Sequence, residues 1–99
     1  MKVIMSINGK IHFVNYEDIE IIYRPYRDGI SFIDIHTAHS TIGGSVRTNI
    51  SNDDFIRELI KLDTIVKECD GLNKTDADKD HIVCITIEDM KFNICIKTR

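Results

Sequence analysis

The sequence predicts an α+β fold: an antiparallel sheet of five to seven strands with one amphipathic helix, at about residues 52–69, packed on one face. Two observations predict this class. One segment repeats apolar residues at helical spacing, while most other segments are short, rich in β-branched residues and separated by turn residues. A chain of 99 residues has the usual size of one domain, so we expect residues 1–99 to form a single domain.

The helix is predicted from residues 51–69, where apolar positions recur at alternating spacings of four and three residues and therefore share one stripe. The stripe consists of Phe55, Leu59, Leu62, Val66 and Cys69, widened by Ile56, Ile60 and Ile65. Ser51 is placed to cap the first turn, and Gly71 is placed as the left-handed residue that commonly ends a helix. One amphipathic helix cannot bury its stripe alone, so the fold needs a sheet.

The first strands are predicted at residues 2–7 and 10–15, on either side of Asn8-Gly9. This dipeptide is a strong hairpin signal because both residues tolerate the positive φ of a type I′ turn. A third strand is predicted at residues 19–26, and Pro25 near its end indicates a sheet edge because proline cannot donate to the ladder. Further strands are predicted at residues 30–37, 41–49, 81–87 and 91–97.

The last predicted hairpin shows a clean alternation of apolar and other side chains. Its register pairs Ile87 with Phe92 on one face and places Cys84 opposite Cys95 on the other. Two readings of the cysteines remain open: free thiols on a half-buried face, or a cross-strand disulfide or redox pair.

The middle hairpin, residues 19–37, carries large side chains on both faces. If Asp28-Gly29 is the tight turn, Ile22 lies opposite Ile35 on one side. The other side then holds Ile21, Tyr23, Phe32, Asp34 and His36. Because one helix covers only one face of a sheet, the second face must curl over, be covered by a loop or meet another protein.

The predicted partner-binding residues are Tyr23, Tyr26, Phe32, Asp34 and His36. They would supply aromatic anchors inside a polar rim. Acidic residues such as Asp18, Asp28 and Asp53 would steer this surface toward a basic, nucleic-acid-handling protein. A net charge of −3 without a basic cluster argues against direct binding of nucleic acid. The alternative is a self-associating module, a homodimer through the same sheet face.

No catalytic residue, metal site or cofactor is predicted. Asp34, His36 and His39 carry metal-ligating atoms, but no fixed further ligand accompanies them. Cys69 ends the predicted helix, where the helix dipole disfavours a thiolate, and the other cysteines lie in strands without an obvious base. We therefore expect a non-enzymatic protein in the reducing cytoplasm, with no membrane contact.

The segment GGSVRTNISNDDFIRELIKL runs from a strand through a Gly-Ser turn into a capped helix with an F-x-x-E-L-x-x-L pattern. That pattern is formed by Phe55, Glu58, Leu59 and Leu62. Over residues 30–96 the chain resembles small bacterial immunity proteins of the cell-wall-associated toxin type. The resemblance implies a non-enzymatic inhibitor that binds and neutralises a toxin. A phage-encoded antagonist of a bacterial defence system would have the same physical signature.

Overall fold

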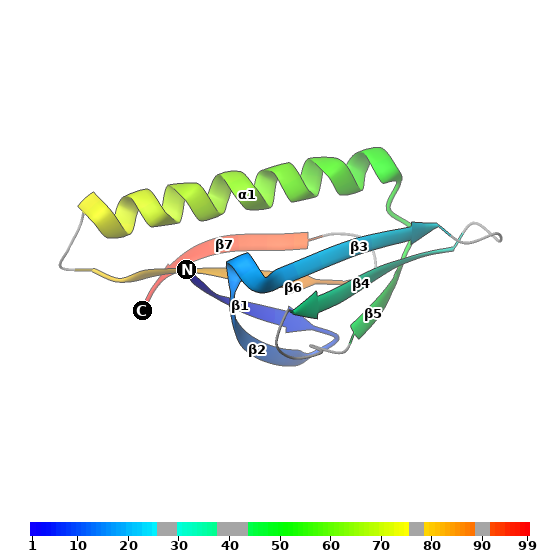
Figure 1. Ribbon diagram of the computed structural model, residues 1–99, viewed down its shortest axis with the longest axis horizontal. Helices are drawn as coiled ribbons and strands as arrows, with labels where there is room; N and C mark the ends of the chain where they lie inside the picture. Colours follow the sequence, from blue (N-terminus) through cyan, green and yellow to red (C-terminus); the bar gives the residue numbers. More distant parts are fainter. Residues whose placement is uncertain (26–29, 38–43, 76–78, 89–91) are drawn as a thin grey trace.

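The structure is a computed structural model that describes residues 1–25, 30–37, 44–75, 79–88 and 92–99 (Figure 1). Its elements in chain order are β1 Lys2–Ile7, β2 Lys10–Asn15, the 3-10 helix η1 Tyr16–Asp18, β3 Ile19–Pro25, β4 Ser31–Thr37, β5 Gly44–Thr48, α1 Asn52–Thr75, β6 His81–Ile87 and β7 Phe92–Thr98. The predicted α+β class with a long helix is confirmed, and each predicted strand has a counterpart among these elements.

The strands form two sheets, where the sequence predicted a single antiparallel one. One sheet has four strands in the order β2-β1-β6-β7, and the other has three in the order β3-β4-β5. The pair β1–β6 is parallel, whereas the other strand pairs are antiparallel. Hairpins are specified locally by their turns, but this parallel pair joins the two ends of the chain and leaves no local signal in the sequence.

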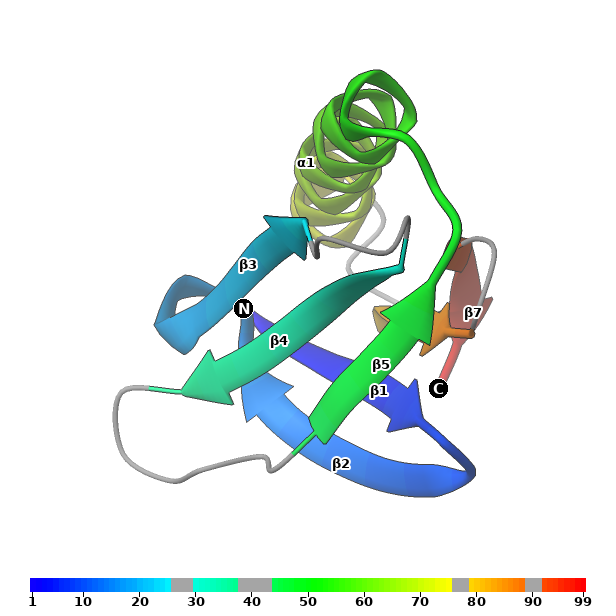
Figure 2. The ribbon, with the colours of Figure 1, turned by 90° about the vertical axis from the view of Figure 1, so that its right-hand side faces the viewer.

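The core lies between the inner faces of the two sheets, and α1 lies above both of them, between β3 and β7 (Figure 2). The four-stranded sheet contributes Val3, Met5, Ile7, Val83, Ile85 and Ile87, and the three-stranded sheet contributes Ile33, Ile35 and Val46. Each sheet therefore shelters the inner face of the other, and the helix is not the only cover for either one.

The predicted helical stripe is confirmed for its central residues, because Phe55, Leu62, Val66 and Cys69 are buried. Its expected widening by Ile56 and Ile60 is wrong, since these side chains are 47% and 62% exposed. The predicted cap is present: the backbone N–H of Asp54 donates to Ser51 Oγ at 3.1 Å. The start of α1 and its buried face therefore follow from the local sequence.

The predicted helix end at Gly71 is wrong, because α1 continues through this residue to Thr75. Contacts with β6 hold the last turn in place. The Asn73 side-chain amide donates to the His81 carbonyl oxygen at 2.9 Å, and the His81 backbone N–H donates to Asn73 Oδ1 at 2.7 Å. Tertiary hydrogen bonds therefore outweigh the low helix propensity of glycine here.

The β3–β4 register differs by one residue from the one predicted with a tight Asp28-Gly29 turn. Ile21 lies opposite Ile35, and Ile22 lies opposite Asp34. This register gathers the branched apolar residues of both strands on the inner face, whereas the predicted register would have mixed them with polar ones. The burial of apolar side chains, and not the predicted Asp28-Gly29 turn, therefore sets the β3–β4 register.

The predictions for the first and the last hairpin are confirmed. Asn8 and Gly9 have φ values of 50° and 81°, as a type I′ turn requires. β3, which ends at Pro25, is an edge strand of its sheet. In the last hairpin Cys84 lies opposite Cys95, as predicted.

Replacing Gly71 with alanine should stabilise the protein by about 0.5–1 kcal/mol, because alanine has the higher helix propensity. The structure leaves room for the change, since a Cβ at this position meets nothing within 4 Å. Urea denaturation of the wild type and of Gly71→Ala measures the difference. A clear loss of stability would mean that residue 71 has the left-handed conformation predicted from the sequence.

Candidate functional site

The structure separates the predicted partner-binding residues. Tyr23 lies on the inner face of β3, where its ring stacks on Phe55 with the ring centroids 5.1 Å apart. Its hydroxyl donates to the Ile50 carbonyl oxygen at 2.9 Å and lies 2.8 Å from Ser31 Oγ. Tyr26 lies outside the described residues. Tyr23 is therefore part of the packing and does not share a face with the other predicted anchors.

Phe32, Asp34 and His36 lie together on the outer face of the three-stranded sheet. Asp34 is only 5% exposed, because Arg24 forms an ion pair with its carboxylate and Ser45 Oγ donates to its Oδ1 at 2.5 Å. A hollow of about 330 Å³ lies beside this pair and is lined by Arg24, Pro25, Phe32 and Ser45. The centre of this face is thus occupied by a charge pair that is already satisfied within the chain.

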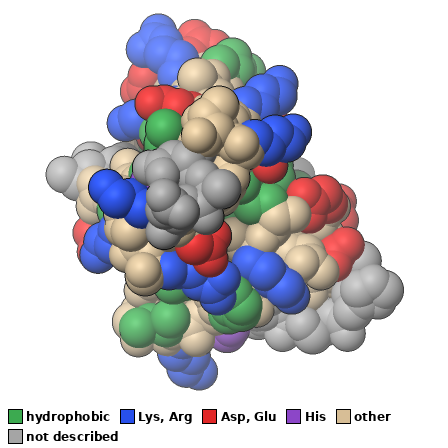
Figure 3. Space-filling view, turned by 90° about the vertical axis from the view of Figure 1, so that its left-hand side faces the viewer, with side chains coloured by type: hydrophobic (Ala, Val, Ile, Leu, Met, Phe, Trp, Pro, Cys, Tyr) green, Lys and Arg blue, Asp and Glu red, His purple; other side chains and the backbone are tan. Residues whose placement is uncertain are grey.

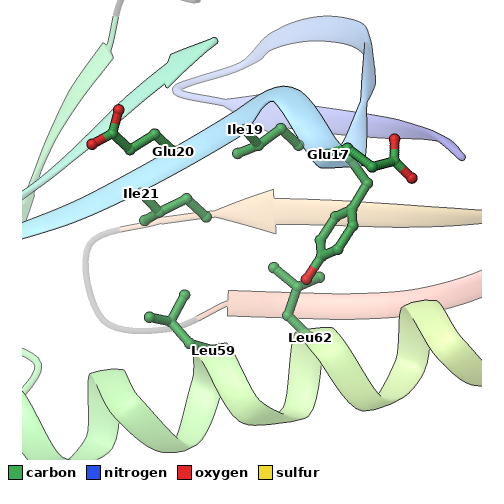
Figure 4. A pocket seen from close by; sticks show the side chains of 7 residues that line it. Glu17, Ile19, Glu20, Ile21, Leu59 and Leu62 are labelled. Atoms are coloured by element: carbon green, nitrogen blue, oxygen red, sulfur yellow. The ribbon is translucent and has the colours of Figure 1, made fainter. Parts of the chain in front are cut away.

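A second hollow, of about 440 Å³, lies between β3 and α1 (Figure 4). Ile19 and Ile21 point from β3 toward the helix, and Leu59 and Leu62 point back from α1. The rest of the lining is Tyr16, Glu17 and Glu20. The hollow is therefore an apolar seam with polar groups at its margin.

The polar groups near this seam are engaged with one another. The N-terminal ammonium donates to Glu17 Oε1 at 2.7 Å and lowers the pKa of that carboxyl group. Lys67 lies 2.8 Å from Asp63 and likewise lowers the pKa of Asp63. Burial raises the pKa of Tyr16, whose hydroxyl donates to Asp63 Oδ1 at 3.4 Å. These groups are paired with one another beside the seam and do not form a nucleophile–base pair.

A third surface is the outer face of the four-stranded sheet, which sequence reasoning missed. Strand registers place four side chains side by side across it, which we call the apolar row: Phe13, Ile4, Cys84 and Cys95. Ile11 lies on the same face of β2 as Phe13, and these two side chains are 74% and 50% exposed. Neither the other sheet nor α1 covers them, so this face keeps a large apolar surface in water.

Cationic groups lie along one margin of the apolar row. Lys2 Nζ lies 5.6 Å from the centroid of the Phe13 ring, and Arg99 Cζ lies 5.3 Å from it. Lys97 projects from the same face of β7 as Cys95, because alternate strand residues share a face. Figure 3 shows Lys and Arg side chains next to hydrophobic ones on the side of the molecule that faces left in Figure 1. The row therefore lies beside positive charge on a chain whose net charge is −3.

One signal for this surface was present in the sequence. The hairpin around Asn8-Gly9 predicts that Ile4, Ile11 and Phe13 share one face. The residues that the core buries lie on the other face of the same hairpin. What could not be foreseen is that β1 pairs with β6, which extends the face to Cys84 and Cys95. The continuous row depends on that long-range pairing.

Comparisons of this chain with protein-family models, with curated proteins and with solved structures found no match. The resemblance to small immunity proteins of the cell-wall-associated toxin type stays a prediction. Within the described part of the chain, no helix has both the length and the apolar character needed to cross a membrane. In the same residues, no three metal-ligating side chains lie close enough to hold an ion.

Replacing Asp63 with asparagine should lower the pKa of Tyr16 toward its ordinary value, because the nearby negative charge that opposes phenolate formation is removed. Burial would keep part of the upward shift. An NMR titration of the Tyr16 ring measures the change. Glu20→Gln is the matched control at the margin of the same seam, and an equal change in both variants would contradict the specific Tyr16–Asp63 contact.

Proposed function

We propose that this protein is a small non-enzymatic inhibitor that binds another protein and occludes its surface. An immunity protein and a phage-encoded antagonist of a bacterial defence system both act in this way. The observation that carries the proposal is the apolar row with its neighbour Ile11 on the outer face of the four-stranded sheet, where Phe13 and Ile11 are exposed. Burial in an interface of one such large apolar side chain contributes about 1.5–3 kcal/mol.

The closed interior supports the choice of this face. The inner faces of both sheets and the stripe of α1 are already buried against one another. On the outer face of the three-stranded sheet, the Arg24–Asp34 ion pair fills the centre. The outer face of the four-stranded sheet combines exposed apolar side chains at its β2 edge with polar groups around them, which is the composition of a protein-binding surface.

Charge indicates the kind of partner. Lys2 and Lys97 lie along one margin of the apolar row, and Arg99, which also forms an ion pair with Asp80 at 3.0 Å, lies beside Phe13. A partner surface with apolar and acidic groups would complement this margin. The expected basic, nucleic-acid-handling target rested on other groups. Asp18 lies in η1 and Asp53 in the first turn of α1, both outside the four-stranded sheet, and Asp28 lies outside the described residues. Binding of a basic partner through these acidic residues stays a prediction.

The second candidate function is a homodimer through the same face, and the exposure of Phe13 and Ile11 also favours it. Two copies that meet face to face with the same margins aligned would bring their Lys2 and Lys97 side chains together, which costs free energy because like charges repel. We therefore favour an unlike partner. Light scattering at two protein concentrations separates the candidates, because a strict monomer rules out the dimer.

Phe13→Asp should weaken capture of the partner at least tenfold, about 1.4 kcal/mol, because it replaces an exposed apolar contact with a carboxylate that an acidic partner repels. The measurement is quantitative pull-down with the immobilised protein from a lysate of the cells that produce it. Ile60→Asp is the matched control, since Ile60 is 62% exposed on α1, away from this sheet.

Both substitutions are at exposed positions, and circular dichroism checks that both variants fold. Equal capture by Phe13→Asp and the wild type would refute the proposed surface. If only Ile60→Asp captured less partner, the binding surface would lie on α1 and not on the four-stranded sheet.

A further inference from the structure

Two thiols occupy one end of the apolar row. Cys84 of β6 and Cys95 of β7 are directly opposite one another in the antiparallel ladder, and both are free. Cys84 is partly exposed and Cys95 is exposed, whereas Cys69 is fully buried in the core on α1. The protein therefore has one accessible pair of facing thiols and one sheltered thiol.

The spacing of the pair suits a covalent bond between the two sulfur atoms. Directly opposite residues of an antiparallel ladder have Cα atoms about 4.5 or 5.5 Å apart. Both values lie within the roughly 4.4–6.8 Å that a disulfide spans. Their Cβ atoms, about 4.5–5.5 Å apart in such pairs, need to approach slightly for a disulfide, whose Cβ atoms are about 3.5–4.5 Å apart. Because Cys95 is exposed, a disulfide formed here is open to attack by a thiolate from solution and hence reversible.

The surroundings of Cys84 act on its thiol from both sides. Burial is the largest cause that raises the pKa of Cys84, and the negative charge and a side-chain hydrogen bond of Cys95 add to it. Lys97 acts in the opposite direction and favours the Cys84 thiolate. The two thiols therefore face each other across the ladder with a cation nearby, and Cys95 is the more accessible of the two to a reagent from solution.

We propose that Cys84 and Cys95 form a reversible dithiol–disulfide site that exchanges with low-molecular-weight disulfides of the glutathione type. The Cys95 thiolate attacks one sulfur of oxidised glutathione, which breaks that disulfide and releases one glutathione thiolate. The Cys84 thiolate then attacks Cys95 Sγ in the mixed disulfide and releases the second. The two cysteine protons pass through solvent to the two glutathione thiolates, so the protein is oxidised by two electrons and oxidised glutathione is reduced.

This chemistry does not depend on the proposed inhibitor function, since it needs only the facing thiols and the reagent. Its consequence for the surface follows from the position of the pair. A bond between Cys84 and Cys95 would link the edge strand β7 covalently to β6. It would also convert the two thiols at the end of the apolar row into one disulfide.

The test uses the folded full-length chain, equilibrated with oxidised and reduced glutathione at graded ratios and then quenched with acid. Intact mass spectrometry should show the loss of two hydrogen atoms, and peptide mapping should place the bond between Cys84 and Cys95. An excess of reduced glutathione should restore the starting mass. Cys69→Ser should behave like the wild type, and Cys95→Ser should lose the intramolecular bond entirely.

Three results would overturn the proposal. The first is thiols that stay free in a large excess of oxidised glutathione, and the second is a reaction that stops at mixed disulfides with glutathione. The third is a bond that includes Cys69, in which case Cys69→Ser would abolish the mass loss. Circular dichroism under the same conditions ensures that the folded protein is the species that reacts.

Discussion

Phe55 is the contact on which the closure of this fold depends. Its ring stacks on Tyr23 of β3 at 5.1 Å and meets the edge of Phe92 of β7 at 6.1 Å between ring centroids. β3 and β7 are edge strands of different sheets, so one side chain of α1 contacts both. Aromatic pairs of this kind contribute about 0.5–1.5 kcal/mol each beyond the free energy of burying their surface. The first turns of α1 thereby join two sheets that no strand connects.

This closure decides which surfaces are left for function. Once α1 and the two inner faces are packed together, the remaining broad sheet surfaces are the two outer faces. One is centred on the Arg24–Asp34 ion pair, where the charges satisfy each other. The other exposes Phe13 and Ile11 beside positive charge. An excess of apolar strand surface was predicted from the sequence, and the structure has such a surface on a different sheet from the one expected.

Short-range features of the fold were predictable because each depends on a few neighbouring residues. The Ser51 cap and the Asn8-Gly9 turn are of this kind, as is the alternation that pairs Cys84 with Cys95. The prediction at Gly71 failed because hydrogen bonds between Asn73 and β6 extend the helix, and no local pattern encodes them. Helix propensity describes each residue in its local segment, so it cannot predict long-range contacts such as these.

The candidate site was predicted in part for the same reason. Phe32, Asp34 and His36 share a face because they alternate along one strand, as expected. Tyr23 was assigned to that face through a register that is one residue off, because the choice between two registers depends on what the core buries. The apolar row was missed because it requires the parallel β1–β6 pair, which brings together residues from opposite ends of the chain.

The most direct test of this account is backbone hydrogen exchange in Phe55→Ala compared with the wild type. If Phe55 closes the two sheets into one core, the variant should lose protection in β3 and β4 and in β6 and β7 together, by a similar factor. The exposed neighbour Ile56 gives the control, since Ile56→Ala should leave exchange in both sheets nearly unchanged. Loss of protection in only one sheet, or in neither, would contradict the claim that this contact joins them.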